Sequence, residues 1–299
     1  MKKPLKSGSI PVFGALCAPK SAFWVPPLLW LLLAAGMLGM NFMPNVIDPF
    51  ADYVSTGKEK AQKPKQAEQF QLAVAEKFTS VDNLYLYLLT HTRDTANKYL
   101  LLQNAENLLK KRFVHAYSVY SLRENWIAVV AGKLIWRNLS AKVIPDDILK
   151  GNGAACSQVS IVFMALCKRF GIPARKVGLN GHYTTEAFVN DRWYFFDLDI
   201  KPDLKAMDER RKSLEHILRE KEQYKLYQNT MLDSSDIDRV FSVVDYGIPN
   251  RNPAPRAALF HQVTKVCSHW GWLVPLYISF SSFAKRSARG PRKKQAKAH

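Results

Sequence analysis

The chain has 299 residues, of which 47% are hydrophobic and 23% are charged. This balance is typical of a protein with a packed core and excludes extensive disorder. The formal net charge is +18, but eleven of the positive charges lie in the first 21 and the last 15 residues, where no acidic residue occurs, which leaves +7 between the ends. Because the excess is concentrated at the ends, it argues against nucleic-acid binding, and we expect no nucleic-acid partner.

An apolar segment follows the basic tail formed by residues 1–21. Residues 22–43 (AFWVPPLLWLLLAAGMLGMNFM) contain no formal charge over 22 positions, which is enough to cross a bilayer as a helix. A cleaved signal peptide is the alternative, because lysines before an apolar run are typical of that as well. The run is long for a signal peptide and no clean Ala-x-Ala site follows it. We therefore expect an uncleaved transmembrane helix.

A second apolar segment lies at residues 266–284 (VCSHWGWLVPLYISFSSFA), and a basic tail at 285–299 follows it. A buried or amphipathic terminal helix is the alternative here, since the segment contains His269 and Pro275. Basic flanks stay on the cytoplasmic side of a membrane. The two segments together predict a protein of the inner (plasma) membrane, in contact with the lipid bilayer. Both termini would be cytoplasmic, and the domain between them would be periplasmic or extracytoplasmic.

Between these segments the sequence predicts a lysine-rich tether over residues 44–68 and one domain over residues 69–265. Apolar residues at three- and four-residue spacing predict helices from about residue 69 to residue 137. An apolar helix from Cys156 to Gly171 comes next, followed by strands at ARKVGL, HYTTEAFV and RWYFFDLDI, of which the last two form an antiparallel hairpin. A charged helical stretch covers residues 207–228. Helices followed by an antiparallel sheet predict the α+β class.

The four cysteines do not predict a protein held together by disulfides. Cys156 and Cys167 lie eleven positions apart on one expected helix, about 16 Å along its axis, which is too far for a bridge. No CxxC pair and no His/Cys pair has the spacing of a zinc site. We therefore expect no metal ion and no cofactor.

Cys156 follows the loop GNGAA and begins the apolar helix. The N–H groups and the dipole at a helix N-terminus favour the thiolate form of a cysteine. A catalytic thiolate also needs a base and a third group that orients the base. His182 begins one strand of the hairpin, and Asp197 lies on the partner strand, so the two side chains are within reach of a hydrogen bond. Taken alone this is a weak signal, because a buried cysteine commonly packs as a small hydrophobe.

Two longer motifs strengthen the interpretation of Cys156, His182 and Asp197 as a catalytic group. They are ILKGNGAACSQVSIVFMALCKRFGIPARKV and HYTTEAFVNDRWYFFD. The first resembles the nucleophile helix of the transglutaminase-like, papain-fold cysteine enzymes, with its exit into the first strand. The second is similar to that family's His-x-x-x-Glu strand, turn, Trp and Asp. The resemblance covers residues 145–200, and it implies an α+β fold with a helical N-terminal part, a buried nucleophile helix and an antiparallel sheet.

The resemblance also implies roles for individual residues. Cys156 would be the nucleophile, His182 the general base and then the general acid, and Asp197 the group that orients the imidazole, with Asp199 as the alternative. Three further positions match the motif and are interpreted as structural, and the second cysteine of the helix is interpreted as core packing. These four residues are Arg175, Glu186, Trp193 and Cys167.

The chain departs from the family pattern at two positions. Ala154 stands two residues before the cysteine, where the family usually has glycine, and Thr184 stands two residues after the histidine, where it usually has an aromatic residue. The donor that stabilises the oxyanion is left open between Trp126 and Trp136.

These features predict a membrane-anchored cysteine enzyme that catalyses acyl transfer or amide hydrolysis through a Cys-His-Asp triad and a thioester intermediate. Its substrate would be a protein, peptide or glycoconjugate on the outer side of the membrane. The alternative is a catalytically inactive binding or scaffold module of the same fold in envelope polysaccharide or glycoconjugate assembly, because a fold by itself does not determine function.

Overall fold

The structure is a computed structural model, and it describes residues 26–43, 70–200, 202, 212–228, 230 and 232–287. The tether predicted at 44–68, the tail at 1–21 and most of the tail at 285–299 lie outside the described residues. The chain divides into a large unit, residues 36–272, and a small unit made of the residues before and after it. Each unit is described by itself.

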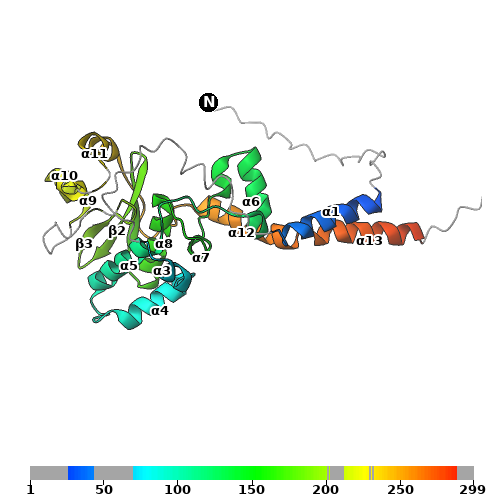
Figure 1. Cartoon of the computed structure of the whole chain (residues 1–299), viewed down its shortest axis with the longest axis horizontal. Helices are drawn as coiled ribbons and strands as arrows, with labels where there is room; N and C mark the ends of the chain where they lie inside the picture. Colours follow the sequence, from blue (N-terminus) through cyan, green and yellow to red (C-terminus); the bar gives the residue numbers. More distant parts are fainter. Residues whose placement is uncertain are drawn as a thin grey trace, which may run out of the picture. The chain divides into compact units, whose positions relative to one another are not determined.

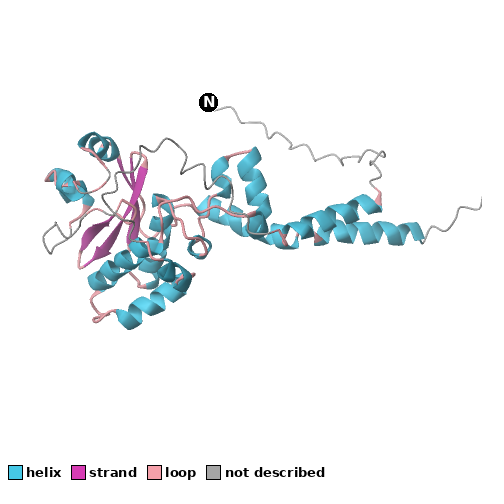
Figure 2. Ribbon diagram, in the orientation of Figure 1, coloured by secondary structure: helices cyan, strands magenta, loops and turns pink. Residues whose placement is uncertain are grey.

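An antiparallel sheet of four strands in the order β3-β2-β1-β4 forms the centre of the large unit. The pairing register places Ala174 opposite Ala187 between β1 and β2, and Ala187 opposite Tyr194 between β2 and β3. Figure 2 shows these strands with helices packed on both sides. The class is therefore α+β. The strands are β1 (Ala174–Leu179), β2 (His182–Val189), β3 (Arg192–Phe196) and β4 (Val244–Tyr246).

Three of the helices that precede the sheet, α4, α5 and α6, begin at residues whose side chains cap them. Ser80 accepts a hydrogen bond from the Asn83 N–H, and Ser121 forms a reciprocal capping box with Glu124. Such caps satisfy N–H groups that have no partner inside a helix. The elements of this part are α3 (Leu72–Lys77), α4 (Val81–His91), α5 (Lys98–Arg112), α6 (Leu122–Leu134), the 3₁₀ helix η1 (Arg137–Ser140) and α7 (Pro145–Leu149).

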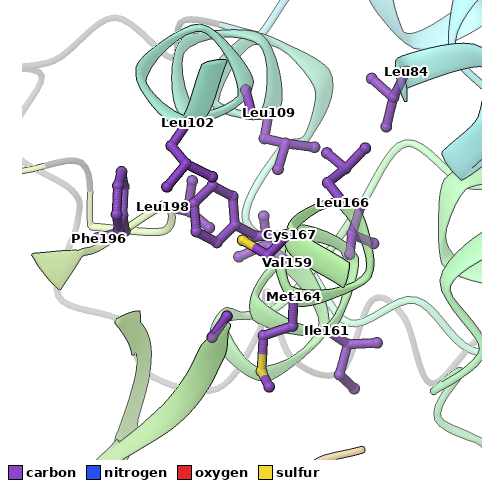
Figure 3. Close-up of a cluster of buried hydrophobic side chains, with 14 of the residues drawn as sticks. Leu84, Leu102, Leu109, Val159, Ile161, Met164, Leu166, Cys167, Phe196 and Leu198 are labelled. Atoms are coloured by element: carbon purple, nitrogen blue, oxygen red, sulfur yellow. The ribbon is translucent and has the colours of Figure 1, made fainter. Parts of the chain in front are cut away.

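Helix α8 (Cys156–Arg169) is enclosed between the sheet and the helices α4 and α5. Nine of its 14 residues are buried, and seven of these nine are apolar. Figure 3 shows its side chains Val159, Leu166 and Cys167 packed with Leu102 and Leu109 of α5. Burying an aliphatic side chain of this size stabilises a fold by about 1.5–3 kcal/mol. This cluster is the main core of the unit.

A second core lies on the opposite face of the sheet (Figure 1). It joins Val177, Leu179 and Phe195 of the strands to three short helices. The charged stretch predicted at 207–228 is described only from residue 212, and its Leu214 and Ile217 side chains are buried in this core. The helices are α9 (Leu214–Arg219), α10 (Gln223–Tyr227) and α11 (Ser234–Phe241).

Helix α12 (Pro255–Trp270) packs on α6 through polar contacts. Asn125, which is fully buried, donates to the Thr264 hydroxyl and accepts from the Ser268 hydroxyl. Buried polar groups stabilise a contact only when their hydrogen bonds are satisfied, and these are. The interface therefore needs this particular register of the two helices.

The transmembrane helices predicted at 22–43 and 266–284 are not found. None of the helices in the described part of the chain is both long and apolar enough to cross a bilayer. The first apolar segment forms α1 (Pro27–Met40), which has 14 residues where a span needs about 20. The second is divided between α12 and α13 (Leu273–Ser287), because α12 ends at Trp270 with Gly271 as its C-cap.

This finding also corrects the localisation. The inner-membrane position, the cytoplasmic termini and the periplasmic domain were all inferred from those two spans. The physical reason for the error is visible in α12, where Ser268 lies inside the predicted span and is buried against Asn125. In the small unit, α13 lies beside the start of α1, and the Ser279 hydroxyl donates to the Pro27 carbonyl.

A buried ion pair joins the sheet to the second core. Glu186 on β2 is inaccessible to solvent and accepts from the Arg175 guanidinium on β1 at 2.7 Å. Its other carboxylate oxygen accepts from the Leu214 N–H, at the first turn of α9. The guanidinium lies over the ring of Trp193. These contacts agree with the structural interpretation of the three motif positions.

We expect Glu186→Gln to destabilise the protein by about 3 kcal/mol, because it leaves a desolvated guanidinium without its counter-charge. The matched control is Asp82→Asn, which breaks the exposed pair with Arg169 and should cost less than about 1 kcal/mol. Urea denaturation followed by circular dichroism measures both. Equal losses in the two variants would show that the buried pair has no special role.

His261 of α12 predicts a pH dependence of stability. Its Nε2 lies 2.9 Å from the Leu139 carbonyl, while its Nδ1 is buried without a partner among the described residues. Burial lowers the pKa of His261 below its usual value, against the opposing effects of the Leu139 carbonyl and the nearby Asp147 carboxylate. Protonation would place an unpaired N–H and a charge in this interior. The unfolded chain therefore binds this proton more readily than the folded chain does.

The stability contributed by neutral His261 is complete above pH 6.5 and should be lost as the pH falls below that value, by up to about 1.4 kcal/mol per pH unit. His261→Gln keeps an N–H donor for Leu139 but does not titrate. Urea denaturation between pH 7.5 and 5 should show a steeper loss for the wild type than for this variant. Parallel curves would contradict the prediction.

Candidate active site

The loop before Cys156 approaches the loop after α5 closely. Gly153 forms a parallel bridge with Val114, and a Cβ at Gly153 would lie 2.9 Å from the Cβ of Ala116. Any larger residue would push the two segments apart. The glycine therefore brings the chain to Cys156, the first residue of α8, which is partly exposed.

Gln158 fixes the first turn of α8. Its side chain is buried and its carbonyl oxygen accepts from the N–H groups of Ser118 and Ala155. Its amide donates to the carbonyls of Ser118 and Lys142. All four bonds go to backbone groups, so this one side chain connects the segments that contain Ser118 and Lys142 to the first turn of the helix. This arrangement holds the cysteine in a defined position.

His182 begins β2 directly after Gly181, whose φ of +78° suits glycine at the tight turn from β1. The imidazole is buried, and its Nε2 lies 2.9 Å from Oδ2 of Asp197. This contact occupies one ring nitrogen. The other nitrogen, Nδ1, is left to face a second partner.

Asp197 follows the last residue of β3 and is inaccessible to solvent. Oδ1 accepts from the N–H groups of Asp199 and Ile200, both at 3.1 Å. Oδ2 accepts from the Tyr227 hydroxyl at 2.7 Å, as well as contacting His182. Burial alone would raise the pKa of Asp197, but His182 and these donors lower it below its usual value.

The structure brings Cys156 to the same imidazole. The Cys156 sulfur, a ring nitrogen of His182 and a carboxylate oxygen of Asp199 lie within 4.8 Å of one another. Burial alone would lower the pKa of His182, but the charge of Asp197, the hydrogen bond to it and contact with Cys156 raise the pKa well above its usual value. A charged imidazolium between a sulfur and a carboxylate is therefore favoured.

Asp199, the alternative for orienting the imidazole, has a different partner. Its Oδ1 lies 2.6 Å from Nδ1 of His115. The hydrogen bond at Nε2 of His182 is accepted by Asp197, so the geometry distinguishes the two aspartates. His115 lies in the loop after α5, and sequence reasoning missed it because nothing in the local pattern marks it.

Sequence reasoning also missed two tyrosines, one beside Cys156 and one bonded to Asp197. Tyr117 is half-exposed, and its pKa is raised by burial and by proximity to Cys156. Tyr227 donates to Asp197, and its burial together with the negative charge of Asp197 raises the pKa of Tyr227 well above its usual value. Both are far from the triad in sequence, and no spacing rule connects them to it.

The other predicted positions have surroundings of their own, and Trp136 is largely exposed. Cys167 is fully buried in the main core (Figure 3), and burial raises the pKa of its thiol. Trp126 already donates its indole N–H to the Ser268 carbonyl on α12. The two departures from the family pattern, Ala154 and Thr184, are both buried, at 2% and 1% exposure, so neither obstructs the exposed side of Cys156.

Comparison with known proteins adds nothing to this picture. No protein-family model, no curated protein sequence and no solved structure matches the chain. The resemblance to transglutaminase-like enzymes therefore remains a prediction from the motifs.

Proposed function

We propose that the protein is a cysteine-dependent acyl-transfer enzyme, a hydrolase or acyltransferase of the transglutaminase-like type. The observation that carries the proposal is the convergence of Cys156, His182 and Asp197. The sulfur lies at the first turn of a helix, beside an imidazole that a buried carboxylate holds in place. A nucleophile, a base and a group that orients the base are the parts that thiolate catalysis requires.

The reaction follows from these positions. His182 accepts the proton of Cys156, and the thiolate attacks the carbonyl carbon of an amide or ester. The new C–S bond forms as the carbonyl electrons move to oxygen. When the oxyanion collapses, the bond to the amine or alcohol breaks, and the His182 imidazolium gives its proton to that leaving group. A thioester on Cys156 remains.

The second half of the reaction reverses these roles. Water or an amine attacks the thioester carbon, and His182 accepts its proton. The C–S bond then breaks, which releases an acid or a new amide and regenerates the thiolate beside the imidazolium. Asp197 stays ionised throughout and stabilises the imidazolium by its charge and by the hydrogen bond at 2.9 Å.

The start of α8 supplies the charge stabilisation that the oxyanion needs. The backbone N–H of Cys156 is at the first helical position, where an α-helix offers no acceptor of its own. The N–H of Ala155 is already bonded to Gln158, so it is not available. An oxyanion donor typically lowers the activation barrier by about 2.7–4 kcal/mol. The half-exposed Tyr117 borders the same position and supports a substrate site there.

Selective alkylation of Cys156 tests the proposal. At neutral pH we expect iodoacetamide to modify Cys156 about tenfold faster than Cys267, although Cys267 is the more exposed thiol, because the His182 imidazole lies beside Cys156 and can take its proton. Quantitative mass spectrometry of the two peptides gives both rates in one sample. In His182→Asn the advantage of Cys156 should disappear. Equal rates in the wild type would contradict the proposal.

Tyr227→Phe tests whether Asp197 acts through its hydrogen bonds. The change removes one donor at 2.7 Å from the carboxylate and leaves a ring of the same shape in the core. We expect a tenfold or smaller fall in Cys156 alkylation, and a larger fall in Asp197→Asn. The control is Tyr224→Phe, whose hydroxyl binds Asp238 on the surface. If Tyr224→Phe has the same effect as Tyr227→Phe, the network has no role in reactivity.

A further inference from the structure

Three potential metal ligands meet at one point, although no zinc-like spacing occurs in the sequence. They are the sulfur of Cys156, a ring nitrogen of His182 and a carboxylate oxygen of Asp199, all within 4.8 Å of one another. They come from the start of α8, the start of β2 and the loop after β3. Thiolate, imidazole and carboxylate are the three side-chain ligands that Zn²⁺ takes in proteins.

The separations are close to those of a zinc site. Zinc holds these ligands at about 2.0–2.3 Å, so in a tetrahedron they stand about 3.3–3.8 Å from one another. The longest separation here therefore has to shorten by about 1 Å. Small rotations of the Cys156 and Asp199 side chains would supply this movement; Cys156 is partly exposed, and the Asp199 side chain is 7% exposed.

The surroundings of the ligands also fit a metal. Nε2 of His182 is bonded to Asp197, which leaves Nδ1 as the coordinating atom and fixes the orientation of the ring. Metal-binding histidines almost always have such a carboxylate or carbonyl on the other nitrogen. Asp199 has a similar support, because Nδ1 of His115 contacts its Oδ1 at 2.6 Å. Two of the three ligands are thus held by a second side chain.

We propose that Cys156, His182 and Asp199 bind Zn²⁺ reversibly and that the bound ion blocks the Cys156 sulfur. Three protein ligands leave the fourth position to water. The proton that the sulfur and the imidazole share leaves to solvent when the metal binds. Zinc binding itself does not need the proposed reaction, whereas its consequence, a regulated nucleophile, rests on the proposed function.

Protection from alkylation tests the site in the full-length protein. The protein is stripped with EDTA, incubated with ZnCl₂ or with MgCl₂, and treated with iodoacetamide. Zinc should lower the alkylation rate of Cys156 at least about tenfold and leave Cys267 unchanged, and EDTA should restore the rate. Magnesium should not protect, because it prefers oxygen ligands in octahedral geometry. Failure of zinc to protect Cys156 in the wild type would overturn the inference without recourse to any variant.

Asp199→Asn identifies the third ligand. The zinc concentration that half-protects Cys156, measured against each variant's own rate without zinc, should rise about tenfold or more. Asp191→Asn is the matched control, since Asp191 is an exposed aspartate at a left-handed turn position that asparagine tolerates. Its half-protecting concentration should equal that of the wild type. An unchanged value in Asp199→Asn would remove Asp199 from the site and overturn the three-ligand assignment.

The two proposals fail in different ways. If Cys156 reacts faster than Cys267 in the zinc-free protein and zinc does not protect it, the metal site is wrong and the proposed enzyme stands. If zinc protects Cys156 but the zinc-free thiol reacts no faster than Cys267, the metal site stands and the catalytic proposal is wrong.

Discussion

The buried carboxylate of Asp197 is the constraint on which the site depends. An ionised carboxylate with no access to solvent is tolerated only when hydrogen bonds and a counter-charge surround it. Here the imidazole of His182, the hydroxyl of Tyr227 and two backbone N–H groups meet that need. Because the tyrosine comes from α10 and the histidine from β2, satisfying this one charge joins the second core to the sheet. It also sets the direction in which the imidazole faces the sulfur.

Gln158 positions the other side of the site, the first turn of α8 with Cys156, through its own hydrogen bonds. Its four bonds to backbone groups attach two loops to the first turn of α8, and the apolar remainder of the helix is held by the main core. The sulfur and the imidazole are therefore positioned by separate polar networks, each anchored in packed structure. The Arg175–Glu186 pair has a different task, since it ties β1 and β2 to α9 and does not contact the sulfur.

Local patterns were sufficient for much of this arrangement. The apolar run after Cys156 and the strand-type residues of HYTTEAFV predict α8 and β2 with the observed first residues. They could not reveal Tyr227 or His115, whose roles arise only when distant segments meet, nor that the ligand atoms of Cys156, His182 and Asp199 lie close enough together for zinc. The apolar character of the segments near the two ends predicted transmembrane helices that the structure does not contain among its described residues. An averaged window detects neither the helix end at Trp270 nor a serine such as Ser268 that is buried against Asn125.

The most direct measurement of the central claim is the reaction of the full-length protein with p-nitrophenyl acetate. If Cys156 forms an acyl-enzyme, the first turnover releases a burst of one equivalent of nitrophenolate per chain, and mass spectrometry finds the acetyl group on the Cys156 peptide. Hydroxylamine should then remove the acetyl group, as expected of a thioester. Absence of a burst, or an acetyl group on Cys267 in place of Cys156, would contradict the account.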